Sequence, residues 1–136
     1  MVLTVSASGN DYDDWIAGLP SITIPADKLF TADPDGDGLT NQQEYAFGLS
    51  PASGSSVNPI TVPLNKTTGM FSYTRRATPA ITGLTYTVLT SSDLVTWIPD
   101  AGAAESIVTA ANVQTVTFTV TNPAVGCKLF VRVRAK

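Results

Sequence analysis

The carboxyl-terminal part of the chain alternates apolar and polar residues with a period of two. Val116, Phe118 and Val120 alternate with Thr117 and Thr119, a pattern that turns one face of a strand to a core and the other to water. No helical pattern separates these runs, which favours an antiparallel over a parallel sheet. The expected strands, rich in β-branched and aromatic residues, are 60–64, 70–75, 84–90, 94–98, 106–109, 113–121 and 127–134.

This succession of short strands predicts a mainly β fold, an antiparallel β-sandwich of the fibronectin III or immunoglobulin-like kind. One large aromatic side chain often fills the centre of such a core. We therefore expect Trp97, together with Val95, to plug the sandwich. Arg75 and Arg76 end a predicted strand and are expected to be solvated.

Helical spacing replaces the alternation near the amino terminus. Tyr12, Trp15 and Ile16 recur at intervals of three and four residues. Asn10 is a suitable N-cap and Pro20 a suitable stop, so we expect a helix between them with Trp15 in a local core. The short apolar run that precedes it, residues 2–6, is expected to form an edge strand.

A second short helix is expected to begin at Thr40 or Asn41 and to end at Gly48. A turn of helix is expected at residues 26–30, and Tyr45 and Phe47 should anchor this region to the structure beneath it. The Ser- and Gly-rich residues 52–58 indicate a connection. We therefore expect a helical unit at 1–51 and a β-sandwich at 59–136, together one compact structural unit.

Residues 33–44, DPDGDGLTNQQE, match the twelve-residue calcium-loop pattern. Acidic residues alternate at its start, Gly38 takes the sixth position and a glutamate the twelfth. Three carboxylates on one tight turn repel each other unless a cation binds them. Ca²⁺ fits such a loop better than Mg²⁺, which demands octahedral geometry and keeps its waters. The expected metal ligands are Asp33, Asp35, Asp37, the backbone carbonyl near Leu39, Asn41 directly or through water, and Glu44.

Two interpretations of this loop stay open at the level of sequence. The first is a Ca²⁺ site with Glu44 as a bidentate ligand. The second is a solvated acidic turn, because Asp-Gly sequences are common in turns. The apolar side chain of Leu39 is free to point into the core beneath the loop in either case.

The composition argues against several classes of enzyme. The chain has no histidine, the commonest general base and zinc ligand. It also has no nucleophile elbow and no phosphate-binding loop, and no pair of acids suits glycoside hydrolysis. The single cysteine, Cys127, is expected to be a small buried hydrophobic residue, with a reactive thiol as the alternative. We do not expect an enzyme.

Charge divides unevenly between the two parts of the chain. Residues 1–50 carry a net charge of −7 and residues 51–136 a net charge of +4. The basic residues are scattered, so nucleic-acid binding is not expected. No apolar run is long enough for a membrane span, and the chain itself shows no signal peptide.

The run 32–51, ADPDGDGLTNQQEYAFGLSP, resembles the calcium-binding repeat of thrombospondin type 3 and the related dockerin loop. Only one copy is present, whereas dockerins carry two. Together with YTVLTSSDLVTW and the final FVRVRAK, it is similar to carboxyl-terminal regions of large secreted proteins of environmental bacteria. The resemblance implies an EF-hand-like Ca²⁺ site in an extracellular, calcium-stabilised terminal module that is not catalytic. We expect Ca²⁺ to fix the helix-loop-helix unit structurally against a β-sandwich that serves adhesion or surface attachment.

Two alternative functions follow from other residues. Trp97 and Tyr86 could form a platform for polysaccharide, as in the carbohydrate-binding module of a secreted enzyme. Exposed edge strands, including residues 2–6, could instead pair with another surface protein or between copies and build a surface layer or filament.

Overall fold

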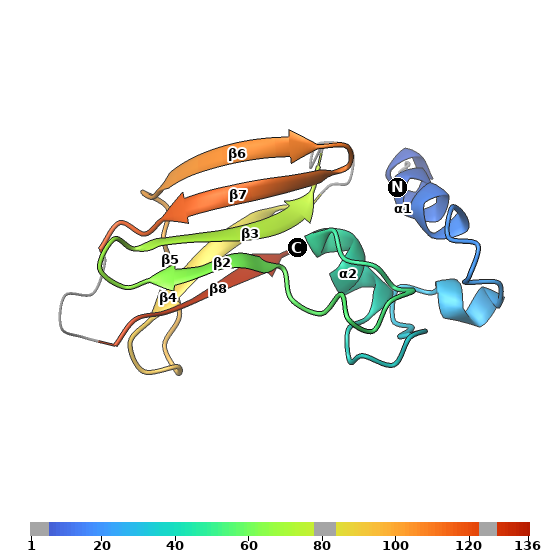
Figure 1. The fold of residues 1–136 in the computed structure, drawn as a ribbon, viewed down its shortest axis with the longest axis horizontal. Helices are drawn as coiled ribbons and strands as arrows, with labels where there is room; N and C mark the ends of the chain where they lie inside the picture. The colour runs from blue at the N-terminus through green and yellow to red at the C-terminus, as the bar shows by residue number, and fades with distance from the viewer. Residues whose placement is uncertain (1–5, 78–83, 123–127) are drawn as a thin grey trace.

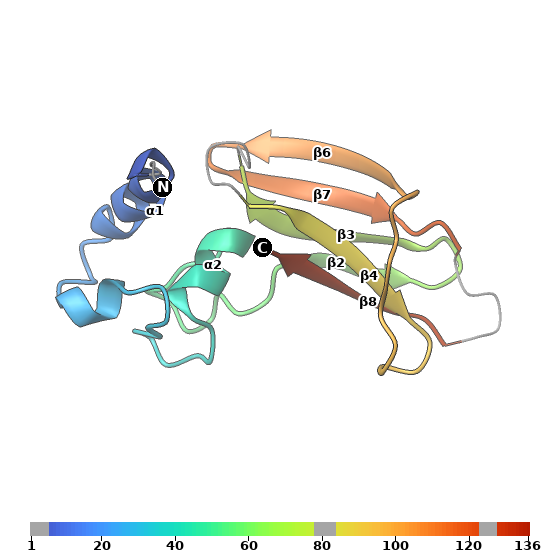
Figure 2. The same ribbon diagram turned by 180° about the vertical axis from the view of Figure 1, so that it is seen from behind.

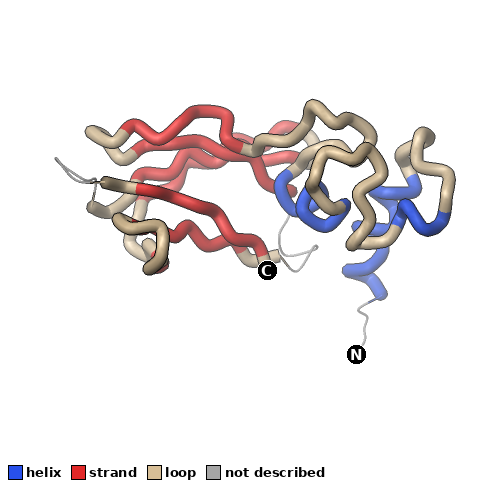
Figure 3. The backbone as a smooth tube through the Cα atoms, turned by 90° about the horizontal axis from the view of Figure 1, so that it is seen from below, coloured by secondary structure: helices blue, strands red, loops and turns tan. Residues whose placement is uncertain are grey.

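Two antiparallel sheets follow a short helical region in the computed structural model, which describes residues 6–77, 84–122 and 128–136. The helices lie at one end of the sheets (Figures 1 and 3). The elements are α1 (Ser6–Ala17), the 3-10 helix η1 (Pro25–Lys28), α2 (Asn41–Phe47), β2 (Ile60–Asn65), β3 (Met70–Arg76), β4 (Tyr86–Ser91), β5 (Ile98–Pro99), β6 (Ala104–Ala110), β7 (Val113–Thr119) and β8 (Phe130–Ala135).

The larger sheet has the strand order β2-β3-β7-β6, and the smaller has the order β5-β4-β8. All strand pairs are antiparallel. Seen from behind, β4 and β8 lie in front of the larger sheet (Figure 2). The mainly β fold with two antiparallel sheets is therefore confirmed.

The core between the sheets is built by the alternation that the sequence predicts. Phe71 and Tyr73 of β3 lie opposite Phe118 and Val116 of β7, and all four side chains are buried. They pack with Val88 of β4 and with apolar residues of β8. Burying such side chains contributes about 1.5–3 kcal/mol each, so this cluster dominates the stability of the sandwich.

The prediction that Trp97 and Val95 fill the core is wrong. Val95 is 81% exposed, and the half-buried Trp97 has the guanidinium of Arg132 over its ring, 4.4 Å from the ring centre. The predicted strand shortens to Ile98–Pro99, because Asp93 Oδ1 accepts the N–H groups of Val95 and Thr96 at 2.8 Å. These bonds form a local turn in place of a sheet ladder.

A second apolar cluster holds the helical region together. Tyr12 and Ile16 of α1 pack with Ile22 and Tyr45, and the half-buried Trp15 lies beside this cluster as expected. The Tyr12 hydroxyl donates to the carbonyl of Lys28 at 3.0 Å, which fastens η1 to α1.

α2 connects this cluster to the sandwich. Tyr45 belongs to the helical cluster, whereas Phe47 packs against the core between the sheets. The Phe47 carbonyl accepts a hydrogen bond from the Thr74 hydroxyl at 2.8 Å, and the Tyr86 hydroxyl donates to the Ala46 carbonyl. The predicted anchoring roles of Tyr45 and Phe47 are thus confirmed.

The first helix begins earlier than predicted. α1 already includes Ser6, so Asn10 lies within the helix and is not its N-cap. The predicted edge strand at 2–6 falls outside the described residues except for Ser6, which is helical. Cys127 also lies outside the described residues. Neither α1 nor α2 has the length and apolar composition that crossing a membrane requires, within the part of the chain that the structure describes.

Candidate metal centre

The acidic loop connects the segment after η1 to the start of α2, and two glycines shape it. Gly36 has φ 75° and Gly38 has φ 95°, both in the left-handed region that favours glycine. A Cβ atom at either position would meet no atom within 4 Å. The backbone conformation, and not the available space, therefore explains glycine at these two positions.

Asp33, Asp35 and Asp37 form the centre of the loop. One carboxylate oxygen from each lies within 4.8 Å of the others, so this triad could hold a metal ion. Backbone N–H groups turn the side chains inward: Gly36 donates to Asp33 Oδ1 at 2.8 Å and Gly38 to Asp33 Oδ2 at 3.0 Å. Hydrogen bonds from the backbone of the loop therefore hold its carboxylates close together without a bound ion.

Several oxygens of this loop are buried without a hydrogen-bond partner. They are Asp35 Oδ2, Asp37 Oδ2 and both carboxylate oxygens of Glu44. Leaving a buried polar group unpaired costs about 1–3 kcal/mol, and more for a charged group. The oxygens belong to the third, fifth and twelfth positions of the loop, which supply ligands in the calcium-loop pattern. This donor set fits a hard cation such as Ca²⁺.

Glu44 lies in α2 and its exposed fraction is 0%. Burial, and after it the negative charges of Asp35, Asp37 and Asp33, together raise the pKa of its carboxyl to about 8. Like charges at short range cannot all stay ionised in a buried place. A divalent ion would remove this repulsion and let all four carboxylates keep their charge.

A capping box fixes where α2 begins and hence where Glu44 stands. The Thr40 N–H donates to Gln43 Oε1 at 2.8 Å, and the Gln43 N–H donates to the Thr40 hydroxyl at 3.4 Å. The helix ends at Gly48, whose φ is 67°. The predicted bounds of this helix are therefore confirmed.

Asn41 is fully buried and ties α2 to the segment around η1. Its Nδ2 donates to the carbonyls of Asp27 at 2.7 Å and Leu29 at 2.8 Å, while Oδ1 has no partner. The amide thus has a structural role that the sequence did not indicate. Its role as a metal ligand, like those of Leu39 and Glu44, stays a prediction.

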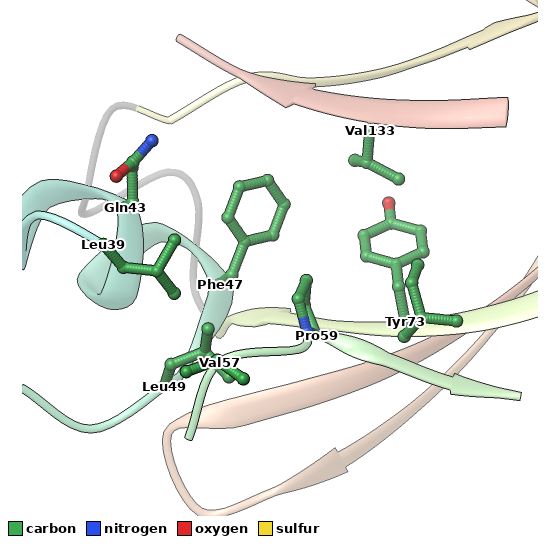
Figure 4. Close-up of a pocket in the computed structure, with 9 residues that line it drawn as sticks. Leu39, Gln43, Phe47, Leu49, Val57, Pro59, Tyr73 and Val133 are labelled. Carbon is green, nitrogen blue, oxygen red and sulfur yellow. The ribbon is translucent and has the colours of Figure 1, made fainter. Parts of the chain in front are cut away.

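The side chain of Leu39 lies between the helical region and the sandwich (Figure 4). It is half-buried and lines a cavity of about 180 Å³ between the helical region and the sheets. Figure 4 shows Leu39 and Phe47 with Tyr73 and Val133 of the two sheets around this cavity. Through Leu39, the acidic loop therefore shares this cavity with residues of both sheets.

Arg75 and Arg76 are both buried, so the prediction of a solvated strand end is wrong. The Arg75 Nε donates to Gln114 Oε1 at 2.9 Å. The Arg76 guanidinium lies over the ring of Tyr45, 4.8 Å from its centre. Successive side chains of β3 point to opposite faces, and each arginine is covered by a different part of the molecule. No local pattern in the sequence could have indicated this.

Trp97 and Tyr86 do not form one platform. Tyr86 lies on the same face of β4 as the core residue Val88, and its hydroxyl is bonded to α2. Trp97 packs on Arg132, whose partner in the sheet is Leu89, on the opposite face of β4. The two rings are thus separated by the sheet.

Comparison of the chain with protein-family models, with curated proteins and with solved structures finds no match.

Proposed function

We propose that this protein is a calcium-binding, non-catalytic module of an extracellular or cell-surface protein, in which the ion fixes the helical region against the β-sandwich. The observation that carries the proposal is the set of buried, unpartnered oxygens on Asp35, Asp37 and Glu44. A solvated acidic turn would leave these oxygens to water. Here they are buried, which is unfavourable unless a cation pairs with them.

In this proposal the ligands follow the order of the loop. Asp33, Asp35 and Asp37 are the ligands at the first, third and fifth positions of the loop. The carbonyl of Leu39 is the ligand at the seventh position, and Glu44, at the twelfth, binds through both oxygens. Asn41 completes the shell directly or through a water molecule. Ca²⁺ is preferred to Mg²⁺ because it accepts six to eight oxygens in flexible geometry at about 2.3–2.6 Å.

The role of the ion is structural. Glu44 stands beside Tyr45, which packs in the helical cluster, and one turn before Phe47, which packs on the core between the sheets. Binding Glu44 to the loop therefore holds α2 in the orientation that both clusters need. A β-sandwich held in this way would serve adhesion or surface attachment.

The extracellular location rests on the resemblance to thrombospondin type 3 loops and on the expected affinity. Single calcium loops in extracellular modules commonly bind with a Kd of about 10⁻⁴ to 10⁻³ M. Such a site fills in calcium-rich surroundings and stays empty in the cytosol.

Thermal unfolding with CaCl₂ and with EGTA tests the proposal. Saturation at about 100 times Kd adds about 2.7 kcal/mol, which for a domain of this size raises the midpoint by roughly 5–10 °C. Asp35→Ala and Glu44→Gln should lose this rise. The matched control, Asp14→Asn, removes an exposed acid of α1 and should keep it. An equal midpoint with and without Ca²⁺ in the wild type would reduce the loop to an acidic turn.

A further inference from the structure

β6 is an edge strand with an open side. It pairs with β7 on one side through an unbroken register from Ala104 to Ala110, and it is the last strand of the larger sheet (Figures 1 and 2). All seven of its residues are exposed, including Val108 at 68% and Ile107 at 44%. No strand of the described residues pairs with its outer side, which therefore offers backbone donors and acceptors to another strand.

The other sheet edges carry features that discourage pairing. β2 contains Pro63 and two register irregularities against β3, and proline cannot donate to a ladder. β5 has only two residues. β8 carries Arg132 and Arg134, both exposed, and charged side chains on an edge are a common protection.

Of these protections β6 has only a single charged side chain, Glu105. Its sequence AESIVTA contains no proline and no basic residue, and its register against β7 has no bulge. Ile107, Val108 and Thr109 are β-branched and favour a strand. This edge therefore differs from the other three in being regular, of full length and nearly uncharged.

We propose that β6 pairs antiparallel with β6 of a second copy of this chain, about a twofold axis at Ile107. In this register all seven residues pair, and Glu105 lies opposite Thr109 of the second copy. A register centred two residues earlier would place Glu105 opposite Glu105, and like charges directly opposite are destabilising. A register centred two residues later, at Thr109, would pair only residues 108–110 and would form fewer backbone hydrogen bonds.

The second copy is favoured as the occupant because the strand is complementary to itself. Ile107 meets Ile107 across the axis on the core side of the sheet, since its neighbour Val116 points to the core. Isologous pairing of this kind closes as a dimer and leaves no further β6 edge. One strand from each copy makes a small interface, so the association is weak and becomes measurable at high concentration.

Sedimentation equilibrium from micromolar to millimolar protein, in CaCl₂, tests the proposal. The mass of the wild type should rise from 14.2 kDa toward twice that value. Val108→Lys should remain monomeric, because the lysines of the two copies would lie diagonally across the axis, where like charges repel. The matched control is Val62→Lys on β2, where Val62 is also exposed, at 53%, and this variant should dimerise as the wild type does.

Two results would overturn the proposal. One is a wild type that stays monomeric at millimolar concentration, even if its β6 edge binds extended peptides of other sequence. The other is a dimer that persists unchanged in Val108→Lys. Circular dichroism of each variant establishes that the fold is retained.

A cross-link tests the register separately. In a Cys127→Ser background, Ile107→Cys should form a disulfide-linked dimer on mild oxidation, because opposite residues of an antiparallel pair bring their Cβ atoms to about 4.5–5.5 Å. Val62→Cys in the same background should stay reduced under these conditions. Equal cross-linking at both positions would contradict pairing through β6.

Discussion

The Nε atom of Arg76, at the end of β3, lies 3.6 Å from Oδ2 of Asp11 in α1. The Arg76 guanidinium also lies over Tyr45, whose hydroxyl donates to Asp11. One buried cation thus joins the first helix, the second helix and the sandwich. These groups are far apart in the chain, so their contacts attach the helical region to the sandwich.

Removing this cation should weaken the attachment. We expect Arg76→Ala to lower the free energy of unfolding by about 2–4 kcal/mol, because it leaves the Asp11 carboxylate without its cation and removes the cation–π contact. Arg134→Ala, at an exposed position of β8, should cost less than about 0.5 kcal/mol. Urea unfolding of both variants measures the difference. Equal costs would mean that the Arg76 cluster does not contribute to stability.

The two loop glycines should be required for their backbone conformation. Gly36→Ala and Gly38→Ala each force a residue with a Cβ into the left-handed region, at a cost of about 1–2 kcal/mol. We expect calcium affinity, measured by isothermal titration calorimetry, to fall by roughly tenfold. Gly54→Ala is the matched control, since its Cβ would lie in ordinary contact with Asp35 and its φ is not in the positive range. Unchanged affinity in Gly36→Ala and Gly38→Ala would contradict this view of the loop.

The end of α2 should be sensitive to side-chain size. A Cβ at Gly48 would lie 2.9 Å from Cγ1 of Val113, and its φ is 67°. We expect Gly48→Ala to cost about 2–4 kcal/mol from the overlap and the backbone strain together. Val113→Ala in the Gly48→Ala background should recover the part due to overlap. A double-mutant cycle measures that part, and a coupling near zero would assign the whole cost to the backbone.

Alkaline pH should loosen the contact between α2 and β4. Burial raises the pKa of the Tyr86 hydroxyl to about 12 from the ordinary value of 10.0. Because the folded pKa is above the unfolded one, the stabilising contribution is present below pH 10 and is lost as the pH rises toward 12. Stability should therefore decline more steeply across this window in the wild type than in Tyr86→Phe. Parallel declines would show that this hydroxyl does not titrate as described.

The sequence predicts the loop and α2 well because their determinants are local. The spacing of Asp33, Asp35 and Asp37, the glycine at 38 and the stop at Gly48 all act within about one or two helical turns. The alternation in β7 likewise predicts its core-facing residues, Val116 and Phe118. These features need no knowledge of distant segments.

The prediction that Trp97 fills the core is wrong because a local hydrogen-bond pattern competes with hydrophobicity. The backbone N–H groups of Thr96 and Val95 bond to Asp93 and hold the pKa of its carboxyl at about 2. The chain turns at these residues and the strand is limited to Ile98–Pro99, while Phe71 and Tyr73 of β3 fill the core. Hydrophobic size alone does not show which aromatic residue reaches the centre.

Neighbouring residues fix turns, caps and side-chain period, which is why the acidic loop, the bounds of α2 and the two-sided strands follow from the order of residues alone. The burial of Glu44 and Arg76, and the place of β6 at the edge of its sheet among the described residues, follow only from the assembled fold. Burial and strand order depend on which distant segments cover a residue. That information arises when the sheets and helices pack together, and no single stretch of the chain contains it.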